Sequence, residues 1–225
     1  MLKLLWSKIY YTFIFDKRYL FFLDGLKVTL QLTFASFLLG TLTGILLCAA
    51  SRSRFKWLRK LAAFFVTIFT EIPTMMLLMI FVYIIFGRSA LPLLWIVAVG
   101  LTLKAGSYLS VIFNSSLEKV AEGEIEAART LGMSRWQAFR YVTLPQTVAA
   151  ALPLYKNQFI VTMQETSVVG YLALVDLTRA ASIVQSRTLD AFFGLIAVTL
   201  IYFLIGAVMK LVFKLVSNNL GGEAA

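Results

Sequence analysis

The chain has 225 residues, 60% of them hydrophobic, and its 21 lysines and arginines outnumber its 11 acidic residues to give a formal net charge of +10. A soluble fold of this length lacks the interior to bury so much apolar surface, so the composition predicts a membrane protein. Positive charge of this kind collects in the cytoplasmic loops of membrane proteins, and nucleic-acid binding is therefore not expected.

Two amino-acid types limit the chemistry. Histidine is absent and Cys48 is the single cysteine. An intrachain disulfide, the usual zinc sites and the Ser-His or Cys-His catalytic arrangements are therefore excluded. We expect no catalytic residue, no metal and no cofactor.

Residues 1–24 combine aromatic rings with lysine, arginine and aspartate. This mixture is typical of a helix that lies along the membrane interface, and a poorly ordered lead-in is the alternative. No small-residue cleavage site follows a short apolar core, so a removable signal peptide is not expected.

A hydrocarbon core of about 30 Å takes about 20 residues of helix to cross. Five runs have that length, at residues 26–50, 61–86, 93–113, 148–171 and 190–213. Gly40 and Gly44 in the first run are spaced to allow close approach of another helix. The second run is broken by Glu71 and Pro73.

The distribution of positive charge predicts the topology. Residues 51–60 hold five basic residues and no acidic one, which places this loop in the cytoplasm. The segment 114–145 lies on the same side, and 87–92 and 172–189 form outer loops. The N-terminus is then outside and the C-terminal tail, 216–225, is cytoplasmic, although the basic residues near the N-terminus oppose this orientation. The predicted fold is an all-α membrane protein with about five transmembrane helices.

Residues 118–145 form the longest polar stretch. An Ala-, Glu- and Leu-rich composition predicts a helix over 118–131, and Gly132 suits the left-handed position that ends a helix. Ser134 and the glutamine three residues later form a capping-box pattern. Pro145 is expected to close a second, short helix that lies across the membrane face.

Four apolar side chains in this polar stretch are candidates for docking a soluble partner or, alternatively, for burial among lipid headgroups. They are Leu131, Met133, Trp136 and Phe139.

The same stretch carries a specific resemblance. Glu126-Ala127-Ala128, three residues, Gly132, nine residues and Val142-Thr143-Leu144-Pro145 resemble the EAA loop of ABC-importer permeases, EAA-x3-G-x9-I-x-LP, with valine for isoleucine. The flanking stretches GLTLKAGSY (100–108), LPQ (144–146) and ETS (165–167) resemble the polar amino acid uptake permeases. The resemblance covers about residues 20–215.

This resemblance implies a type-1 ABC transmembrane domain over 25–215 in a bacterial inner membrane. Its partners would be a cytoplasmic ATPase dimer, a second permease subunit that is identical or a sister chain, and an extracytoplasmic substrate-binding protein. The loop 118–145 would act as a coupling helix seated in a groove of the ATPase. The chain has no G-x4-G-K-[ST] phosphate loop, so ATP hydrolysis is expected on a separate chain.

Five residues are predicted to couple to the ATPase. Glu126 offers a charge, Ala127 and Ala128 leave room for the groove, Gly132 permits the turn, and Trp136 docks.

Ionisable groups inside a span are expensive unless they are paired or hydrated. At about 1.5 Å per residue, Glu71 and Lys104 both lie near mid-membrane. We expect them to form an ion pair that lines or braces the path of a zwitterionic substrate, or that only fixes helix register. The substrate-path candidates are Glu71, Lys104, Tyr108, Gln164, Glu165 and Thr166.

Some positions depart from the family pattern. Val111 and Asn114 stand where relatives carry an acid and a base, and Gln164 stands where they carry lysine. A different substrate, or a less substrate-contacting place in a permease heterodimer, would explain this. Glu165 near the end of its span also has the option of snorkelling to water.

Two alternatives to an amino acid importer stay open. An ion-coupled secondary transporter would use Lys104 and Glu165, although five spans without a repeat are few for that class. An ABC permease for a different small polar solute is the second alternative.

Overall fold

The computed structural model describes residues 2–219, with side chains described for residues 6–215. Every regular element in that part of the chain is helical, as predicted. The principal helices are α1 (Leu2–Ile9), α2 (Tyr19–Ser51), α3 (Lys56–Glu71), α4 (Thr74–Met79), α5 (Leu93–Leu117), α6 (Glu122–Thr130), α7 (Arg135–Ala138), α8 (Leu144–Glu165), α9 (Leu177–Thr188) and α10 (Ala191–Asn219). Shorter turns of π and 3₁₀ helix are η1 (Tyr10–Ile14), η2 (Phe15–Lys17), η3 (Ile80–Ile85), η4 (Phe139–Thr143) and η5 (Thr166–Leu172).

Within the described residues, three helices are long and apolar enough to cross a membrane alone, at Tyr19–Ser51, Leu93–Leu117 and Ala191–Leu215. Two further spans arise if bent pairs are each counted as one. These pairs are Lys56–Glu71 with Thr74–Ile85, bent by 109°, and Arg135–Leu172 with Leu177–Thr188, bent by 46°. The expectation of about five transmembrane helices agrees with this count.

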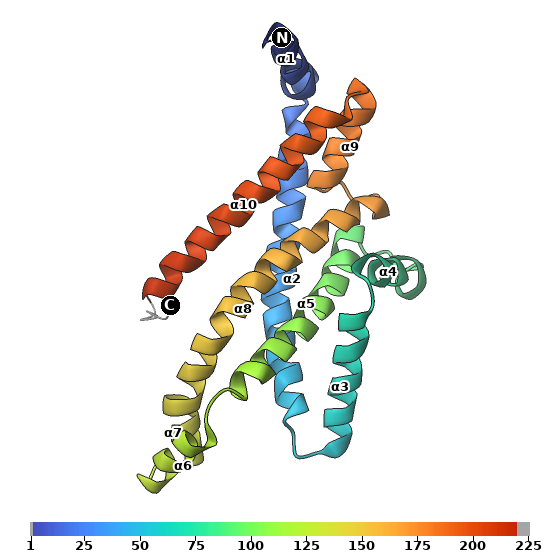
Figure 1. The fold of residues 1–225 in the computed structure, drawn as a ribbon. Helices are drawn as coiled ribbons and strands as arrows, with labels where there is room; N and C mark the ends of the chain where they lie inside the picture. The colour runs from blue at the N-terminus through green and yellow to red at the C-terminus, as the bar shows by residue number, and fades with distance from the viewer. Residues whose placement is uncertain (1, 220–225) are drawn as a thin grey trace.

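Helix α5 is the centre of the bundle, with α2, α3 and α8 packed around it (Figure 1). Its apolar window is 67% buried, against 39% for α2 and 22% for α10. Helix α10 crosses the outside of the bundle and exposes most of its apolar side chains. Within the monomer, α5 is therefore the scaffold and α10 the most exposed span.

The contact between α2 and α5 depends on glycine. A Cβ added at Gly40 would lie 3.0 Å from the Cβ of Ala105, and one added at Gly44 would lie 2.8 Å from the Cβ of Leu109. The reciprocal glycine is Gly106, where an added Cβ would lie 2.8 Å from that of Thr43. The close approach predicted from the glycine spacing is confirmed.

The N-terminal segment differs from the prediction in its boundary. Helix α2 already begins at Tyr19, so residues 19–24 belong to the first span and not to a separate interfacial element. The chain turns before α2 at Asp16, where φ is 55°. The Lys8 ammonium then donates to the Asp190 carboxylate at 2.8 Å, which fastens this segment to the start of α10.

The predicted outer loop 172–189 is wrong, because most of it forms helix α9. Asp176 caps this helix, and its carboxylate accepts from the backbone N–H groups of Thr178 at 3.0 Å and Arg179 at 2.9 Å. Leu177 and Val184 bury one face of α9 against α2 and α10. The aspartate N-cap was a sequence signal that could have found this helix.

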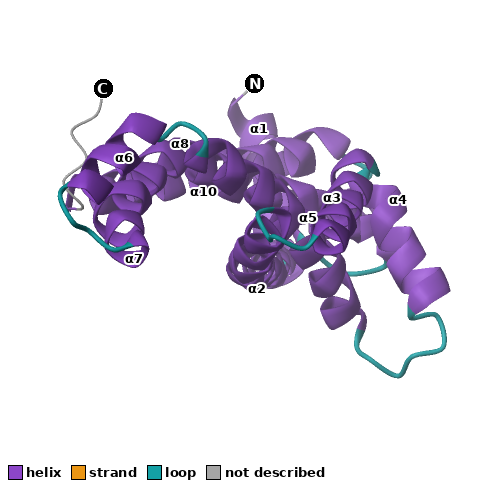
Figure 2. Ribbon diagram, turned by 90° about the horizontal axis from the view of Figure 1, so that it is seen from below, coloured by secondary structure: helices purple, strands orange, loops and turns teal. Residues whose placement is uncertain are grey.

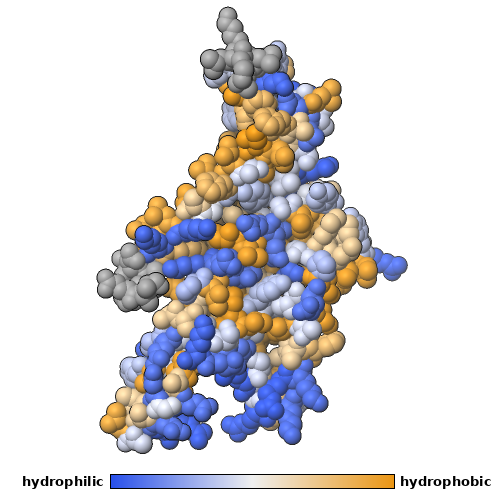
Figure 3. Space-filling view, viewed as in Figure 1, coloured by the Kyte–Doolittle hydropathy of each residue, from blue (hydrophilic) through white to orange (hydrophobic). Residues whose placement is uncertain are grey.

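Two further segment boundaries differ from the prediction. Helix α5 runs to Leu117 and α6 begins only at Glu122, so the predicted helix 118–131 starts four residues late. Helix α10 continues to Asn219, inside the predicted tail 216–225, and the rest of that tail lies outside the described residues. Hydrophilic side chains gather at the end of the bundle that carries α6, α7 and the α2–α3 connection (Figure 3).

Candidate coupling segment and substrate path

Helix α6 ends in the glycine joint that the sequence predicted. Gly132 has φ of +86°, in the left-handed region. Its N–H donates to the Arg129 carbonyl at 3.1 Å, and the Met133 N–H donates to the Ala128 carbonyl at 3.2 Å. These two bonds form a Schellman motif, in which the last carbonyls of a helix are satisfied by the reversing chain. The predicted turn is confirmed.

The capping box that restarts the helix is also confirmed. The Gln137 N–H donates to the Ser134 hydroxyl at 3.2 Å, and the Ser134 N–H donates to the Gln137 side-chain oxygen at 2.8 Å. Gln146 of α8 donates in turn to Glu124 of α6. Residues 118–145, which we call the coupling segment, thus stabilise their own turns through local contacts.

The prediction that Pro145 closes a separate short helix is wrong. The chain is continuously helical from Arg135 through the π turn η4 into α8. Pro145 is the second residue of α8. The Leu144 N–H bonds to the Phe139 carbonyl across the π turn. A π turn widens the hydrogen-bond spacing, so the helix passes Pro145, which has no N–H to donate, without ending there. The second half of the coupling segment is therefore continuous with the fourth span.

The exposed residues of the coupling segment lie beside its glycine joint. Leu131 is 82% exposed and Trp136 is 65% exposed, and the Trp136 ring stacks on Phe139 with centroids 5.7 Å apart. Glu126 and Ala127 are also exposed. From below, α6 and α7 lie together at one side of the molecule, apart from α2 and α3 (Figure 2).

Ala128 departs from its expected role. Its side chain is only 5% exposed and faces the chain itself, where α6 meets η4. Ala128 therefore supports the coupling segment from inside, and only Ala127 of the pair is open to a partner.

The second candidate region, after the coupling segment, is the break between α3 and α4 at Ile72 and Pro73. We call it the helix break. Ile72 is extended, with φ of −72° and ψ of 128°, and the two helices meet at 109°. Proline disfavours helical geometry in the residue before it, so this pair ends α3. The predicted interruption of the second span is confirmed, and the bend turns α4 sharply away from α3.

Lys104 and Tyr108, both on α5, contact the end of α3 at the helix break. The Lys104 ammonium donates to the Ile72 carbonyl at 2.7 Å and lies 3.5 Å from the Phe69 carbonyl. The Tyr108 hydroxyl donates to the Thr70 carbonyl at 3.0 Å. Lys104 is only 3% exposed.

The predicted ion pair between Glu71 and Lys104 is wrong. Among the described side chains no salt bridge joins these two residues. Glu71 is exposed, while Lys104 is buried against backbone carbonyls. The prediction failed because proline frees strong backbone acceptors that compete with a carboxylate for the ammonium.

Glu165, at the end of α8, meets the other half of the helix break. The Thr74 hydroxyl, at the start of α4, donates to its carboxylate at 2.8 Å. The second carboxylate oxygen is buried and has no protein partner among the described residues. Glu165 therefore faces the helix break and does not snorkel to water. Thr74 was missed in the sequence, because a single threonine after a proline carries no distinctive signal.

The remaining path candidates lie near this position on α8 and η5. Gln164 is exposed, whereas Thr166 is fully buried and donates to the Met163 carbonyl at 2.7 Å. The structure thus brings together Lys104, Tyr108 and Glu165 at the helix break and leaves Glu71 and Gln164 on the surface of the monomer.

The positions that depart from the family charges have separate environments. Val111 is 48% exposed on α5. Asn114 braces the end of the bundle that carries α6 and α7, where its side-chain oxygen accepts from the Arg52 guanidinium at 2.9 Å. Arg52 also reaches Glu118 at 3.3 Å. Asn114 therefore ties α5 to the end of α2, and Arg52 extends this contact to Glu118 at the start of the coupling segment.

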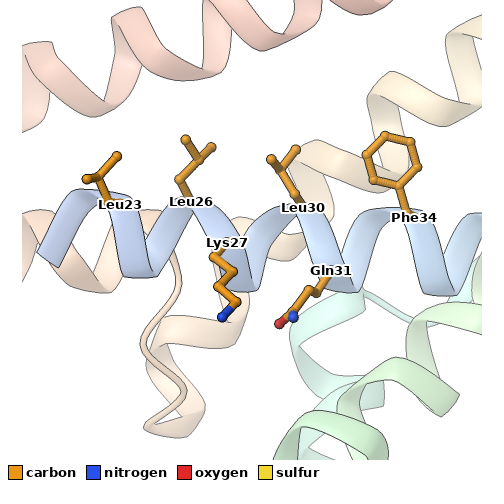
Figure 4. Close-up of a pocket in the computed structure, with 6 residues that line it drawn as sticks. All are labelled: Leu23, Leu26, Lys27, Leu30, Gln31 and Phe34. Carbon is orange, nitrogen blue, oxygen red and sulfur yellow. The ribbon is translucent and has the colours of Figure 1, made fainter. Parts of the chain in front are cut away.

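A hollow of about 300 Å³ lies beside Val111 and Asn114, and two larger ones lie elsewhere on the bundle. An open one of about 500 Å³ follows α2, where Leu23, Leu26, Leu30 and Phe34 point to one side and Lys27 and Gln31 to the other (Figure 4). An apolar one of about 590 Å³ lies between α2, α5 and α8, beside the coupling segment, with Cys48, Arg52 and Tyr155 in its wall. Neither contains a residue predicted to line the substrate path.

An all-helical bundle with a polar joint at one end and charges at a broken span defines a membrane-spanning transport subunit. The chain belongs to the family of binding-protein-dependent transport system inner membrane components, whose sequence pattern matches residues 36–221. It is thus the inner-membrane permease subunit of an ABC importer.

Individual relatives agree with this assignment. The chain is 33% identical over 176 residues to a glutamate/aspartate import permease protein of Escherichia coli O6:H1, covering 74% of this chain and 79% of the relative. It is 27% identical over 187 residues to a probable amino-acid permease protein of Bacillus subtilis, covering 81% and 84%.

Solved structures share the fold. A chain in a crystal structure of an amino acid ABC transporter with histidines is 30% identical, with a TM-score of 0.81, covering 88% of this chain and 94% of that one. A methionine ABC transporter in an inward-facing conformation, 21% identical, has the same fold with a TM-score of 0.73, covering 91% and 98%.

Proposed function

We propose that this chain carries a polar amino acid across the inner membrane and is driven by a separate ATPase. The names of the relatives support the substrate class, since those that name a substrate transport glutamate, aspartate or glutamine. The helix break also fits a path for a zwitterion, because it is faced by the Glu165 carboxylate, one oxygen of which has no protein partner among the described residues. The substrate arrives from an extracytoplasmic binding protein, which is in keeping with a family described as binding-protein-dependent.

One observation carries the mechanism. The chain is helical from Arg135 in the coupling segment to Glu165 at the helix break, with Pro153 inside this run, and the helix that follows Leu172 is turned by 46°. At about 1.5 Å per residue, these 31 positions span roughly 45 Å. A displacement of Trp136 at one end is therefore delivered to Glu165 and Thr74 at the other.

The coupling segment is the docking surface for the ATPase. Its exposed apolar residues, Leu131 and Trp136, stand beside a glycine joint in an otherwise polar setting, which fits insertion into a groove. Glu126 and Ala127 contact the same groove, and Gly132 holds the turn that presents them. In this arrangement the N-terminus is outside, the C-terminus is cytoplasmic, and residues 2–18 lie at the outer interface.

The path itself needs a second permease subunit, identical or a sister chain. Three polar side chains are exposed on membrane-crossing helices, those of Glu71, Asn157 and Gln164. Such groups are costly against lipid and are tolerated where they line a hydrated path between subunits. ATP binding then biases the outward-facing state through different contacts in the two states.

A reconstituted importer tests this proposal. Proteoliposomes would contain this chain with its second permease subunit and its ATPase, ATP on the cytoplasmic side, and binding protein with labelled glutamate, glutamine, aspartate or histidine outside. We expect uptake of one or more of these that stops when ATP is replaced by a non-hydrolysable analogue. Uptake that ignores ATP and collapses with a protonophore would instead identify an ion-coupled secondary transporter. ATP-driven uptake of none of the four would remove the amino acid assignment while keeping the permease.

A further inference from the structure

The helix break leaves a defined set of backbone acceptors without their helical partners. In a continuous helix the Phe69 carbonyl would accept from residue 73, but proline has no N–H to give. The Thr70 and Ile72 carbonyls would accept from residues 74 and 76, but the 109° bend carries those N–H groups away. The last carbonyl of α3 that keeps a backbone partner here is that of Ile68, which accepts from Ile72 at 3.2 Å.

Two side chains of α5 reach these three carbonyls. Lys104 serves Ile72 and Phe69, and Tyr108 serves Thr70. The two residues are four apart, so they lie on one face of α5, one turn above the other. A cation at this position also complements the negative end of the α3 dipole. Backbone groups left without partners are costly in a membrane, so these contacts favour the bent form.

The charge of Glu165 does not explain where Lys104 points. No salt bridge joins Lys104 to an acidic residue within the described part of the chain, and the ammonium is instead directed at the Ile72 carbonyl at 2.7 Å. Glu165 is occupied by Thr74 at the start of α4. The two charges therefore hold opposite sides of the helix break, Lys104 the end of α3 and Glu165 the start of α4.

We propose that Lys104 is a positioning residue that holds the second span in its bent form by capping the freed carbonyls of α3, with Tyr108 as its second donor. It acts on the backbone of the helix break and needs no contact with the substrate. Only its consequence for transport rests on the proposed function: the bend sets where α4 meets Glu165, the residue to which α8 delivers the movement of the coupling segment.

Hydrogen–deuterium exchange of the full chain in lipid nanodiscs tests this directly. Lys104→Met keeps the length and apolar stem of the side chain and removes its three donors. We expect the amides of residues 68–77 to exchange about tenfold faster, because losing a buried charge-assisted hydrogen bond opens the segment locally. The amides of α2 and of the coupling segment should keep their wild-type protection.

Three matched variants separate capping from charge balance. Lys104→Arg still donates and should stay within about threefold of wild type. The double variant Lys104→Met with Glu165→Gln is electrically balanced but has no ammonium donor, and it should exchange at least as fast as Lys104→Met alone. Tyr108→Phe removes one neutral donor without changing shape and should accelerate the same amides by about threefold.

Each result either supports the capping role of Lys104 or overturns it. Unchanged exchange in Lys104→Met, or full recovery of protection in the double variant, would overturn the capping role. If Lys104→Met fails to insert, Tyr108→Phe carries the test, and unchanged exchange at 68–77 in that variant overturns the proposal. No substrate or ATPase enters these measurements, so a failure to transport amino acids would leave them untouched.

Discussion

The coupling segment and the helix break both interrupt helical backbone, and they satisfy the freed backbone groups in opposite ways. At the coupling segment the partners lie within five residues along the chain, as with Gly132 to Arg129 and Ser134 to Gln137. At the helix break the freed carbonyls accept from side chains of another helix, Lys104 and Tyr108 of α5, while Glu165 of α8 accepts from the Thr74 side chain. One interruption is held locally and the other by its neighbours.

This difference has a mechanical consequence. A joint that carries its own hydrogen bonds keeps its shape when a partner moves it. A break held by neighbouring helices changes when those helices shift relative to each other. Because α8 is continuous with the coupling segment at one end and carries Glu165 at the other, the rigid joint is placed to receive movement and the break to respond to it.

The largest expected effect follows from the rigid joint. Gly132→Val puts a β-branched residue at φ of +86°, a region that costs an L-residue about 1–2 kcal/mol or more. We expect stimulation of the ATPase to fall at least about tenfold while membrane insertion is unchanged, measured on the reconstituted complex. Gly132→Asn, which tolerates the left-handed region, should retain most of the stimulation. Equal activity in the two variants would show that the geometry of the joint is not what transmits the movement.

The next effect concerns the start of α4. Thr74→Val keeps the shape of the side chain but removes the hydroxyl that donates to Glu165 at 2.8 Å. A hydrogen bond to a charged group contributes about 1.5–3 kcal/mol, so the unfolding free energy in detergent should fall by about that amount. Thr74→Ser, which keeps the donor, is the control. A loss equal to that of Thr74→Val in the serine variant would assign the effect to packing.

A smaller, local effect is expected at the capping box. Ser134→Ala removes the acceptor for the Gln137 N–H and should cost about 1 kcal/mol in the first turn of α7. Amides of residues 135–138 should exchange about fivefold faster, while those at the helix break are unaffected. Ser134→Asn, an equally good N-cap, should restore protection. Faster exchange at residues 68–77 in Ser134→Ala would contradict the claim that the coupling segment is held locally.

The smallest effect involves an exposed contact away from both regions. The hydrogen bond from Lys8 lowers the pKa of Asp190, which lies just before α10. Because the pKa of Asp190 is lower in the folded chain than its unfolded value of about 3.9, the contact with Lys8 stabilises the folded segment above pH about 3.9. This stabilisation is lost as the pH falls through the folded pKa. Proteolysis within residues 6–17 should therefore accelerate only at acidic pH. In Asp190→Asn the rate should already be raised at neutral pH and should lack this acidic step.

The same contrast explains what the sequence could predict. The glycine joint and the capping box follow from local rules, so Gly132, Ser134 and Gln137 were found from their spacing alone. The break was found at Pro73 for the same reason. The contacts of Lys104 and Glu165 depend on which helix faces come together, and periodicity does not specify this in a helix that is apolar on all sides. The sequence therefore led to a pair between Glu71 and Lys104 that the fold does not make.

Two further errors have the same origin. Proline is expected to end a helix when the turn before it has α spacing. The turn before Pro145 is the π turn η4, so the helix continues past this proline. Ala128 matches the EAA pattern, but burial of its side chain depends on how α6 folds back onto η4, which the motif alone does not determine.

The central claim is that the coupling segment faces the cytoplasm and is covered there by an ATPase. Leu131→Cys in a Cys48→Ser background places one thiol at the most exposed apolar position of that segment. We expect a membrane-impermeant maleimide to label this thiol in inside-out vesicles but not in right-side-out vesicles. Bound ATPase should block this labelling. Labelling from the extracytoplasmic side, or labelling that the ATPase does not reduce, would contradict the account.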